Sequence, residues 1–191
     1  MRDKTRFQAD ALKAMQAAAH EAAGAPGPEE AISAITRAEH ELLGDRDAWR
    51  RPGALLEGEK DQYASGGLFL LPGGDRHVLI GPHNYGPEQT HMVFSSELGH
   101  PGVVVKTRQP LMLENTDEHK SFVKILATFR AGSVVFCPVI WKGEFHGLLA
   151  CAAQARGAMS ADDLEVHRGF ADLAAAAWVA HGGPQFVKQF A

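Results

Sequence analysis

Residues 133–154 read SVVFCPVIWKGEFHGLLACAAQ, and this stretch decides the fold. Two apolar runs, residues 133–141 and 145–154, flank the turn sequence Lys142-Gly143-Glu144. The first run is rich in β-branched and aromatic residues, and two apolar runs of strand length separated by a glycine-containing turn are typical of a β-hairpin. The sequence therefore predicts two neighbouring antiparallel strands in the middle of a sheet.

Further strand signals precede this hairpin. The segments with strand-like composition are residues 68–71, 77–80, 91–94 and 111–113. Pro72-Gly73-Gly74-Asp75 lies between the first two of them and predicts a tight turn. Residues 99–105, GHPGVVV, fit a strand by their valines and a helix by Pro101, which suits a helix N-terminus. Composition alone does not decide whether this segment is a strand or a helix.

Helical patterns occupy both ends of the chain. The expected helices span residues 5–23, the segment from Pro28 to a stop at Gly44, and the segment from the capping sequence Ser160-Ala161-Asp162-Asp163 to about His181. A further helix is expected after the caps Asn115-Thr116-Asp117, because Phe122, Ile125, Leu126 and Phe129 follow at helical spacing. The predicted organisation is a helical hairpin over 1–44 that packs with the C-terminal helix, a connection over 45–66, a sheet domain over 67–182 and a tail over 183–191.

Composition excludes several classes of protein. Of the 191 residues 45% are hydrophobic and 22% charged, which is typical of a globular chain, and two cysteines exclude a disulfide scaffold. With 19 Lys and Arg against 23 Asp and Glu there is no basic field for nucleic acid. No apolar stretch is long enough to cross a membrane, and the N-terminus lacks the pattern of a signal peptide. We expect a cytoplasmic protein with neither a nucleic-acid nor a membrane partner.

From about residue 67 to 180 the chain resembles a GAF domain, a sensor fold related to PAS. The resemblance lies in GHPGVV (99–104) with TRQP (107–110) and NTD (115–117), in the hairpin at 133–149, and in SADDL (160–164) with Phe170-Ala171 before an Ala-rich helix. It implies an α+β fold: an antiparallel sheet of five or six strands, terminal helices on one face, and a ligand cavity under short helices on the other. It also implies that residues 99–105 are helical.

The resemblance implies a sensor that binds an unidentified small molecule and relays its occupancy to a signalling partner through the terminal helices. The candidate ligand-binding residues are Tyr85, His91, Phe94, His100, Val104, Asn115, His119, Phe122, Phe129, Val134 and Phe136. The ligand class stays open. An anion is favoured by the N-terminus of the helix at 99–105, where His100 lies, and a planar or apolar molecule by the aromatic residues, Phe69 among them. The sequence does not indicate which cofactor, if any, the protein binds.

Histidines and cysteines suggest two other chemistries. His83, His91, His100, His119 and His146 fall near the expected cavity, but none forms the paired spacing of a metal site, so no metal is expected. One GAF subgroup reduces free methionine sulfoxide with loop cysteines. Cys137 and Cys151 lie in the middle of predicted strands, and the register implied by the resemblance turns Cys137 toward the terminal helices. A thiol-dependent reductase is therefore the disfavoured alternative to a non-enzymatic sensor.

The C-terminal helix carries a stripe of small and apolar residues. Its members are Leu164, Phe170, Ala171, Ala174, Ala177 and Trp178. Small residues allow helices to approach closely, so the stripe fits both its own sheet and residues 5–43 of a second subunit. We expect a homodimer, with a ligand-free adaptor module as a further alternative to the sensor.

Overall fold

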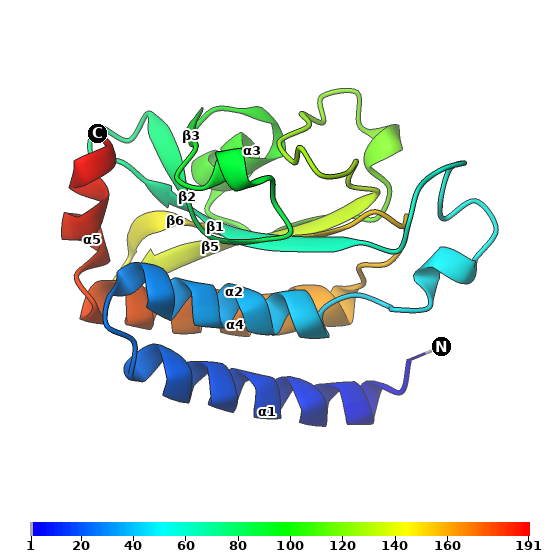
Figure 1. Cartoon of the computed structure of the whole chain (residues 1–191), viewed down its shortest axis with the longest axis horizontal. Coiled ribbons are helices and arrows are strands. Elements are labelled where there is room, and N and C mark those ends of the chain that lie inside the picture. Colours follow the sequence, from blue (N-terminus) through cyan, green and yellow to red (C-terminus); the bar gives the residue numbers. More distant parts are fainter. Residues whose placement is uncertain (1) are drawn as a thin grey trace.

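A computed structural model describes residues 2–191, and its centre is one antiparallel sheet of six strands (Figure 1). The strands are β1 (Tyr63–Leu70), β2 (Arg76–His83), β3 (Val93–Ser95), β4 (Leu111–Leu113), β5 (Ser133–Trp141) and β6 (Glu144–Ala153). Their order across the sheet is β3-β2-β1-β6-β5-β4, and every neighbouring pair is antiparallel. The hairpin predicted over residues 133–154 is therefore confirmed as β5 and β6, and the sheet has six strands, the larger of the two expected numbers.

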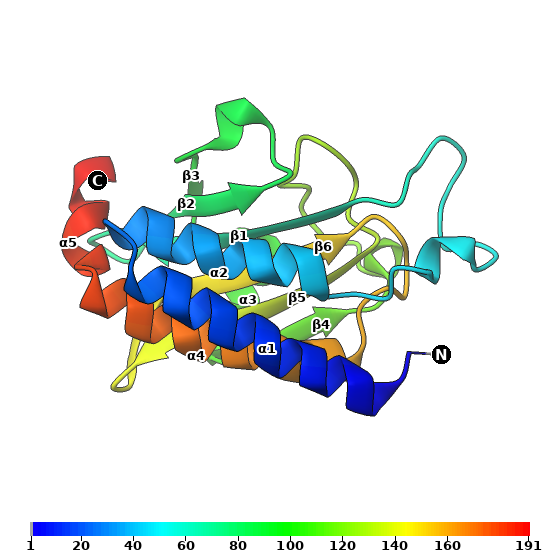
Figure 2. The ribbon, with the colours of Figure 1, turned by 60° about the horizontal axis from the view of Figure 1, so that its bottom comes forward.

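Three long helices cover one face of this sheet. They are α1 (Lys4–Ala23), α2 (Pro28–Leu42) and α4 (Ala161–Ala180). The α2 and α4 helices lie directly on the sheet, and α1 packs outside them as a further layer (Figures 1 and 2). Pro28 occupies the first turn of α2, and Ser160 and Asp163 form a capping box at the start of α4. The predicted starts of α2 and α4 are therefore confirmed, with the N-terminal residues that the sequence indicated.

The buried residues between the sheet and these helices form the helix-side core. It includes Ile32 and Ile35 of α2, Phe69 of β1 and Trp178 of α4. The Trp178 ring stacks on Phe69 with ring centroids 3.8 Å apart. Much of the alanine stripe on α4 is buried here, against the chain's own sheet, α1 and α2. The homodimer stays a prediction.

The opposite face of the sheet is covered by less regular structure. It carries α3 (Gly99–Thr107) and residues 119–132, which we call the cover segment. The buried residues beneath them form the cover-side core, which includes Leu68, Val104 and Leu148. The helix expected at 99–105 from the family resemblance is confirmed as α3.

The cover segment is not the helix that its spacing predicts. After the caps, a single 3-10 turn over Thr116–Glu118 forms, and the chain then runs irregularly to Gly132. Ser121, Val123 and Thr128 favour helix poorly, and nucleating a short helix is costly. Two backbone groups of the segment instead bond to the Gln89 side chain, and the Thr128 hydroxyl donates to the Asn84 carbonyl oxygen. The cavity side of the sheet is therefore covered by α3 and this irregular segment, rather than by short helices alone.

Other boundaries differ from the expectation. The strand β1 begins at Tyr63, inside the expected connection, which also holds a 3-10 turn over Ala48–Arg50. The third strand begins at Val93, because His91 has a positive φ of 59° and belongs to the preceding turn. The expected C-terminal tail folds into α5 (Gly183–Phe186) and a 3-10 helix (Val187–Phe190).

No helix within residues 2–191 combines the length and the apolar character needed to cross a lipid bilayer.

Candidate functional site

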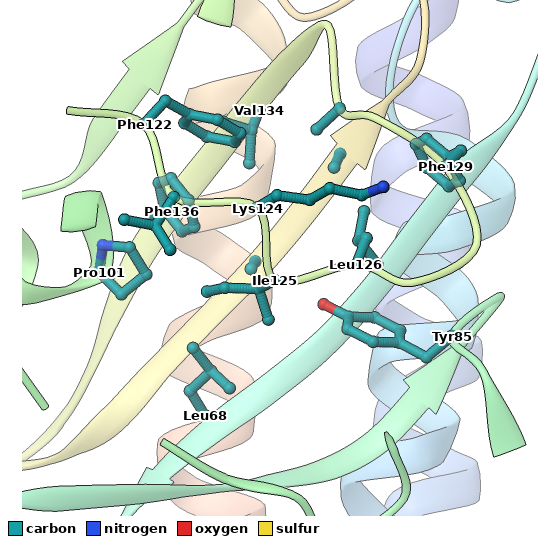
Figure 3. A pocket seen from close by; sticks show the side chains of 14 residues that line it. Leu68, Tyr85, Pro101, Phe122, Lys124, Ile125, Leu126, Phe129, Val134 and Phe136 are labelled. Atoms are coloured by element: carbon teal, nitrogen blue, oxygen red, sulfur yellow. The ribbon is translucent and has the colours of Figure 1, made fainter. Parts of the chain in front are cut away.

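An apolar cavity lies between the sheet and the cover segment (Figure 3). Its volume is about 40 Å³. It is lined by Leu68, Tyr85, Pro101, Phe122, Val123, Lys124, Ile125, Leu126, Phe129, Ala131, Val134, Phe136, Ala150 and Ala152. A space of this size holds little more than a water molecule or two, so a larger guest requires the cover segment to move.

The floor of the cavity comes from neighbouring strands. Val134 of β5 lies opposite Ala152 of β6, and Phe136 lies opposite Ala150. Residues directly opposite each other share one face of the sheet, so each large side chain is paired with a methyl group. The two alanines leave the hollow above β6, and Leu68 of β1 closes its side (Figure 3).

The Gln89 side chain holds the middle of the cover segment. Its amide nitrogen donates to the Ile125 carbonyl oxygen at 2.7 Å, and its carbonyl oxygen accepts from the Ala127 N–H at 2.9 Å. The same oxygen accepts from the Gly86 N–H at 3.2 Å. One buried side chain therefore joins the loop that carries Tyr85 to the middle of the cover segment.

Four charged side chains fix both ends of the cover segment, and we call them the charged ring. Arg130 contacts Glu59 at 3.0 Å and Asp117 at 2.5 Å. Arg156, just beyond β6, contacts the same two carboxylates at 3.1 Å and 2.7 Å. Burial alone would raise the pKa of Glu59, but the hydrogen bond from the Leu56 N–H and then the two arginines lower it, and the net shift is downward. The ends of the cover segment are thereby tied to the sheet and to the connection before β1.

Two of the lining residues are polar. Tyr85 directs its hydroxyl into the cavity, and Lys124 extends across it from the cover segment (Figure 3). Burial raises the pKa of Tyr85, so its hydroxyl is protonated and available as a donor. Within residues 2–191 neither the Tyr85 hydroxyl nor the Lys124 ammonium has a hydrogen-bonding or ion-pair partner. The site therefore offers donors and contains no carboxylate.

The structure brings together five of the eleven sequence-predicted residues at this cavity. They are Tyr85, Phe122, Phe129, Val134 and Phe136. Phe94 and Val104 are buried in the cover-side core but do not line the cavity. Phe69, also considered as a pocket aromatic, points to the other face of the sheet, where it stacks on Trp178.

Two predicted histidines meet at the edge of this site. The rings of His100 and His119 lie edge to face with centroids 5.3 Å apart, and Phe122 lies 5.6 Å from His100. His100 is buried, and its Nδ1 atom has no hydrogen-bond partner in the described chain. Burial, and then the neighbouring His119, lower the pKa of His100, so it is neutral near pH 7.

The remaining predicted residues lie elsewhere. His91 contacts Glu29 of α2 at 2.6 Å and packs near Phe190, on the helix side of the molecule. Asn115 caps the 3-10 turn, where its side-chain oxygen accepts from the Asp117 N–H at 3.2 Å. His83, another histidine considered near the cavity, contacts Ser33 of α2.

Sequence reasoning missed most of the cover segment and Gln89. A helix presents every third or fourth residue to the cavity, whereas the irregular chain presents Phe122 through Leu126 in succession. Ala150 and Ala152 carried a usable signal, because small residues alternate there on the face opposite Cys151. Nothing in the sequence marks Gln89, whose role depends on a contact with a segment 36 residues away.

Both cysteines are buried in the helix-side core. Cys137 lies opposite Leu149, and Cys151 lies opposite Val135, so the two thiols are offset along the hairpin. Burial, followed by the charge of Glu39, raises the pKa of each thiol. A thiol in such surroundings is protonated and inert. The expected orientation of Cys137 toward the terminal helices is confirmed by its proximity to the Leu164 carbonyl at 4.0 Å.

A buried polar pair links the helices to the sheet. Glu39 of α2 and His167 of α4 are both inaccessible to solvent, and Glu39 Oε1 lies 2.8 Å from His167 Nδ1. The other ring nitrogen lies 3.2 Å from the Leu149 carbonyl oxygen. Desolvation raises the pKa of Glu39, and His167 opposes that shift. As for metals, residues 2–191 contain no group of three His, Cys, Asp or Glu side chains arranged to bind one.

Comparisons with known proteins agree with this architecture. A family model described as GAF domain matches residues 28–178, a region that starts at α2 and omits α1. A search of curated proteins finds no match.

Solved structures with similar folds include two from bacterial phosphotransferases. The GAF domain of a phosphoenolpyruvate-protein phosphotransferase from Coxiella burnetii superimposes with a TM-score of 0.74 at 18% identity, over 93% of this chain and 96% of that chain. Its counterpart from Acinetobacter has a TM-score of 0.70 at 16% identity, over 90% and 93%. The free methionine-R-sulfoxide reductase of Neisseria meningitidis, solved with its substrate, has a TM-score of 0.70 at 12% identity, over 95% and 93%.

Proposed function

The chain belongs to the GAF domain family, and from that premise we propose that it is a sensor that binds a small molecule in the cavity beneath the cover segment. The observation that carries this proposal is the construction of the site. A floor of paired strands faces an irregular cover whose middle is held by the Gln89 side chain and by one bond from Thr128 to the Asn84 carbonyl oxygen. Such a cover can open and close on a guest without disturbing the sheet.

Occupancy can reach the terminal helices through β5 and β6. Val134 and Phe136 of β5 line the cavity, while Val135 and Cys137 of the same strand belong to the helix-side core against α4. On β6, the carbonyl of Leu149 contacts His167 of α4, next to the cavity residue Ala150. A ligand shifts the helices only through its different affinity for two arrangements of these contacts.

The test is native mass spectrometry of the protein after incubation with a small-molecule extract of its expression host. We expect an added mass that is lost on denaturation and is absent from the Phe136→Trp variant, because the larger indole fills the cavity. Leu12→Gln, on the exposed outer face of α1, is the matched control and should retain the mass. Equal binding by Phe136→Trp would place the site elsewhere, and no bound mass in any sample would contradict the sensor function.

One observation favours a second candidate, a ligand-free adaptor. The cavity of about 40 Å³ is nearly filled by the chain's own side chains. An adaptor predicts that no component of the extract binds and that the melting temperature stays constant with and without it. The thiol-dependent alternative receives no such support, because both cysteines are buried and protonated.

We further propose that the protein is cytoplasmic and works as a homodimer with a signalling partner. Leu164 of the α4 stripe stays only partly buried, which leaves an apolar position on this helix for a contact with a second subunit. Size-exclusion chromatography with light scattering measures the assembly, and the mass of a single chain at micromolar concentration would contradict the dimer.

A further inference from the structure

We propose that the ligand of this cavity is a ring-containing monocarboxylate, a planar apolar body with one anionic head. This inference rests on the proposed sensor function and specifies the chemistry of the same site. It is drawn from the side chains that line the cavity and from the charges of the cover segment.

The body of the ligand follows from the walls. Twelve of the lining side chains are apolar, and the aromatic rings of Phe122, Phe129 and Phe136 approach the space from the cover and from the floor (Figure 3). Aromatic walls favour flat rings, which they contact by stacked and edge-to-face arrangements. Polar groups along the body of a ligand would lose their hydration here without replacement.

The two polar lining residues indicate that the head of the ligand is an anion. Tyr85 supplies a protonated hydroxyl directed into the cavity, and Lys124 supplies an ammonium over it. Neither donor is bonded to another group within residues 2–191; Tyr85 is half-buried and Lys124 lies at the exposed rim. The lining provides no carboxylate that a cationic ligand would require. A carboxylate has acceptors for both donors and one charge for one lysine.

The charged residues of the cover segment also favour an anionic ligand. Between His119 and Gly132 the sequence holds Lys120, Lys124 and Arg130 and no Asp or Glu. Arg130 is engaged by the carboxylates of the charged ring, whereas Lys124 forms no ion pair with residues 2–191. An anion entering beneath this segment therefore passes Lys120 and Lys124, which form no ion pair within residues 2–191, while the acidic side chain of Asp117 is held by Arg130 and Arg156.

The test compares phenylacetate with its neutral isostere phenylacetamide and with acetate, by isothermal titration calorimetry on the full chain. We expect phenylacetate to bind about tenfold more tightly than phenylacetamide, since a hydrogen bond to a charged group exceeds one to a neutral group by roughly this factor. Acetate should not bind measurably, because it lacks the apolar body.

Three variants then test whether the carboxylate of the ligand binds at Lys124 and Tyr85. Lys124→Gln should reduce the preference for phenylacetate to about one, and phenylacetamide binding should stay unchanged. Lys120→Gln is the matched control, since it removes an exposed lysine of the same segment that does not line the cavity, and it should retain the preference. Tyr85→Phe should weaken the binding of both compounds.

The outcomes separate this inference from the sensor function. Equal binding of phenylacetate and phenylacetamide, or a preference unaffected by Lys124→Gln, would overturn the inference. If neither compound binds while the extract delivers a neutral or cationic molecule to the cavity, the sensor function stands and the inference fails. If neither compound nor extract binds, both fail together.

Discussion

The two faces of the sheet are packed by different means. On one face, α2 and α4 bring complete helical surfaces to the strands, and Trp178 stacks on Phe69 in a core without solvent-exposed members. On the other face, an irregular segment contributes Phe122, Leu126 and Phe129 and leaves a small cavity beneath them. Backbone groups are satisfied within the helices on the first face, whereas on the second they depend on side chains such as Gln89.

The comparison shows how one sheet can serve stability and adaptation at once. A helix that packs with many side chains is lost only when the whole domain unfolds, while an irregular segment with few bonds opens locally at lower cost. We therefore expect substitutions in the helix-side core to change the global free energy of unfolding. Substitutions in the cover segment should change local opening.

The largest effect is expected at the buried pair of Glu39 and His167. His167→Ala leaves the Glu39 carboxyl group in the core without a partner, and we expect a loss of about 3–5 kcal/mol in the free energy of unfolding. Urea denaturation measures it. Replacing both residues by leucine should recover most of the loss, and a single-variant loss below about 1 kcal/mol would show that the helix-side core tolerates the orphaned carboxyl group.

A matched pair of leucines tests the comparison directly. Leu149→Ala in the helix-side core should cost about 3 kcal/mol of global stability, within the range for buried leucines. Leu126→Ala in the cover segment should cost about 1 kcal/mol, because the segment can collapse into the space it leaves. Equal losses in urea denaturation would mean that the cover segment unfolds only with the sheet.

His77 makes the cover-side core sensitive to acid. Its ring lies near Phe145, and burial together with Arg108 lowers its pKa to about 4. The unfolded chain, with a histidine pKa of about 6.5, binds this proton first, so stability is full above pH 6.5 and falls as the pH drops toward 4. Between pH 7 and pH 5 the loss attributable to His77 is about 2 kcal/mol.

The variant His77→Phe should remove that part of the pH dependence. Urea denaturation at pH 7 and pH 5 gives the two free energies, and His20→Gln, an exposed histidine on α1, serves as the control. If the His77 variant and the wild type lose equal stability between the two pH values, the histidine is charged in the folded protein.

The smallest global effect and the most local one are expected for Gln89→Ala. The variant removes the two bonds to Ile125 and Ala127, so amide hydrogen exchange in residues 119–132 should rise by about tenfold or more. Exchange in α2 and β6 should stay constant. Gln109→Ala, at an exposed position, is the control. An unchanged rate in the cover segment would assign its attachment to the charged ring and the bond between Thr128 and Asn84 instead.

The same division explains what could be predicted from the sequence. The hairpin and the capping box at Ser160 follow from local patterns, and both are confirmed. The antiparallel sheet of five or six strands was implied by the family resemblance. The helix α3 did not follow from composition, since its valines favour a strand, and required the family resemblance. The hairpin and the helix caps can be predicted because their sequence signals are local.

The candidate site was only partly predictable because its cover is not periodic. Phe122, Leu126 and Phe129 have helical spacing, yet tertiary contacts with residues 84–89 replace the helix. Aromatic type alone did not reveal which face each ring occupies, so Phe69 was grouped with residues that do line the cavity. Strand register decides this, and it is visible only once the partners are known.

The charged ring has a consequence for how such a protein can diversify. Asp117 and Arg130 hold the two points at which the cover segment leaves and rejoins the folded chain. The residues between them can then be exchanged, shortened or extended while the strands and helices keep their places, since a loop tolerates changes in length at small cost. Evolution can therefore change what the cavity accepts by substitutions in one stretch of about a dozen residues, while the fold stays the same.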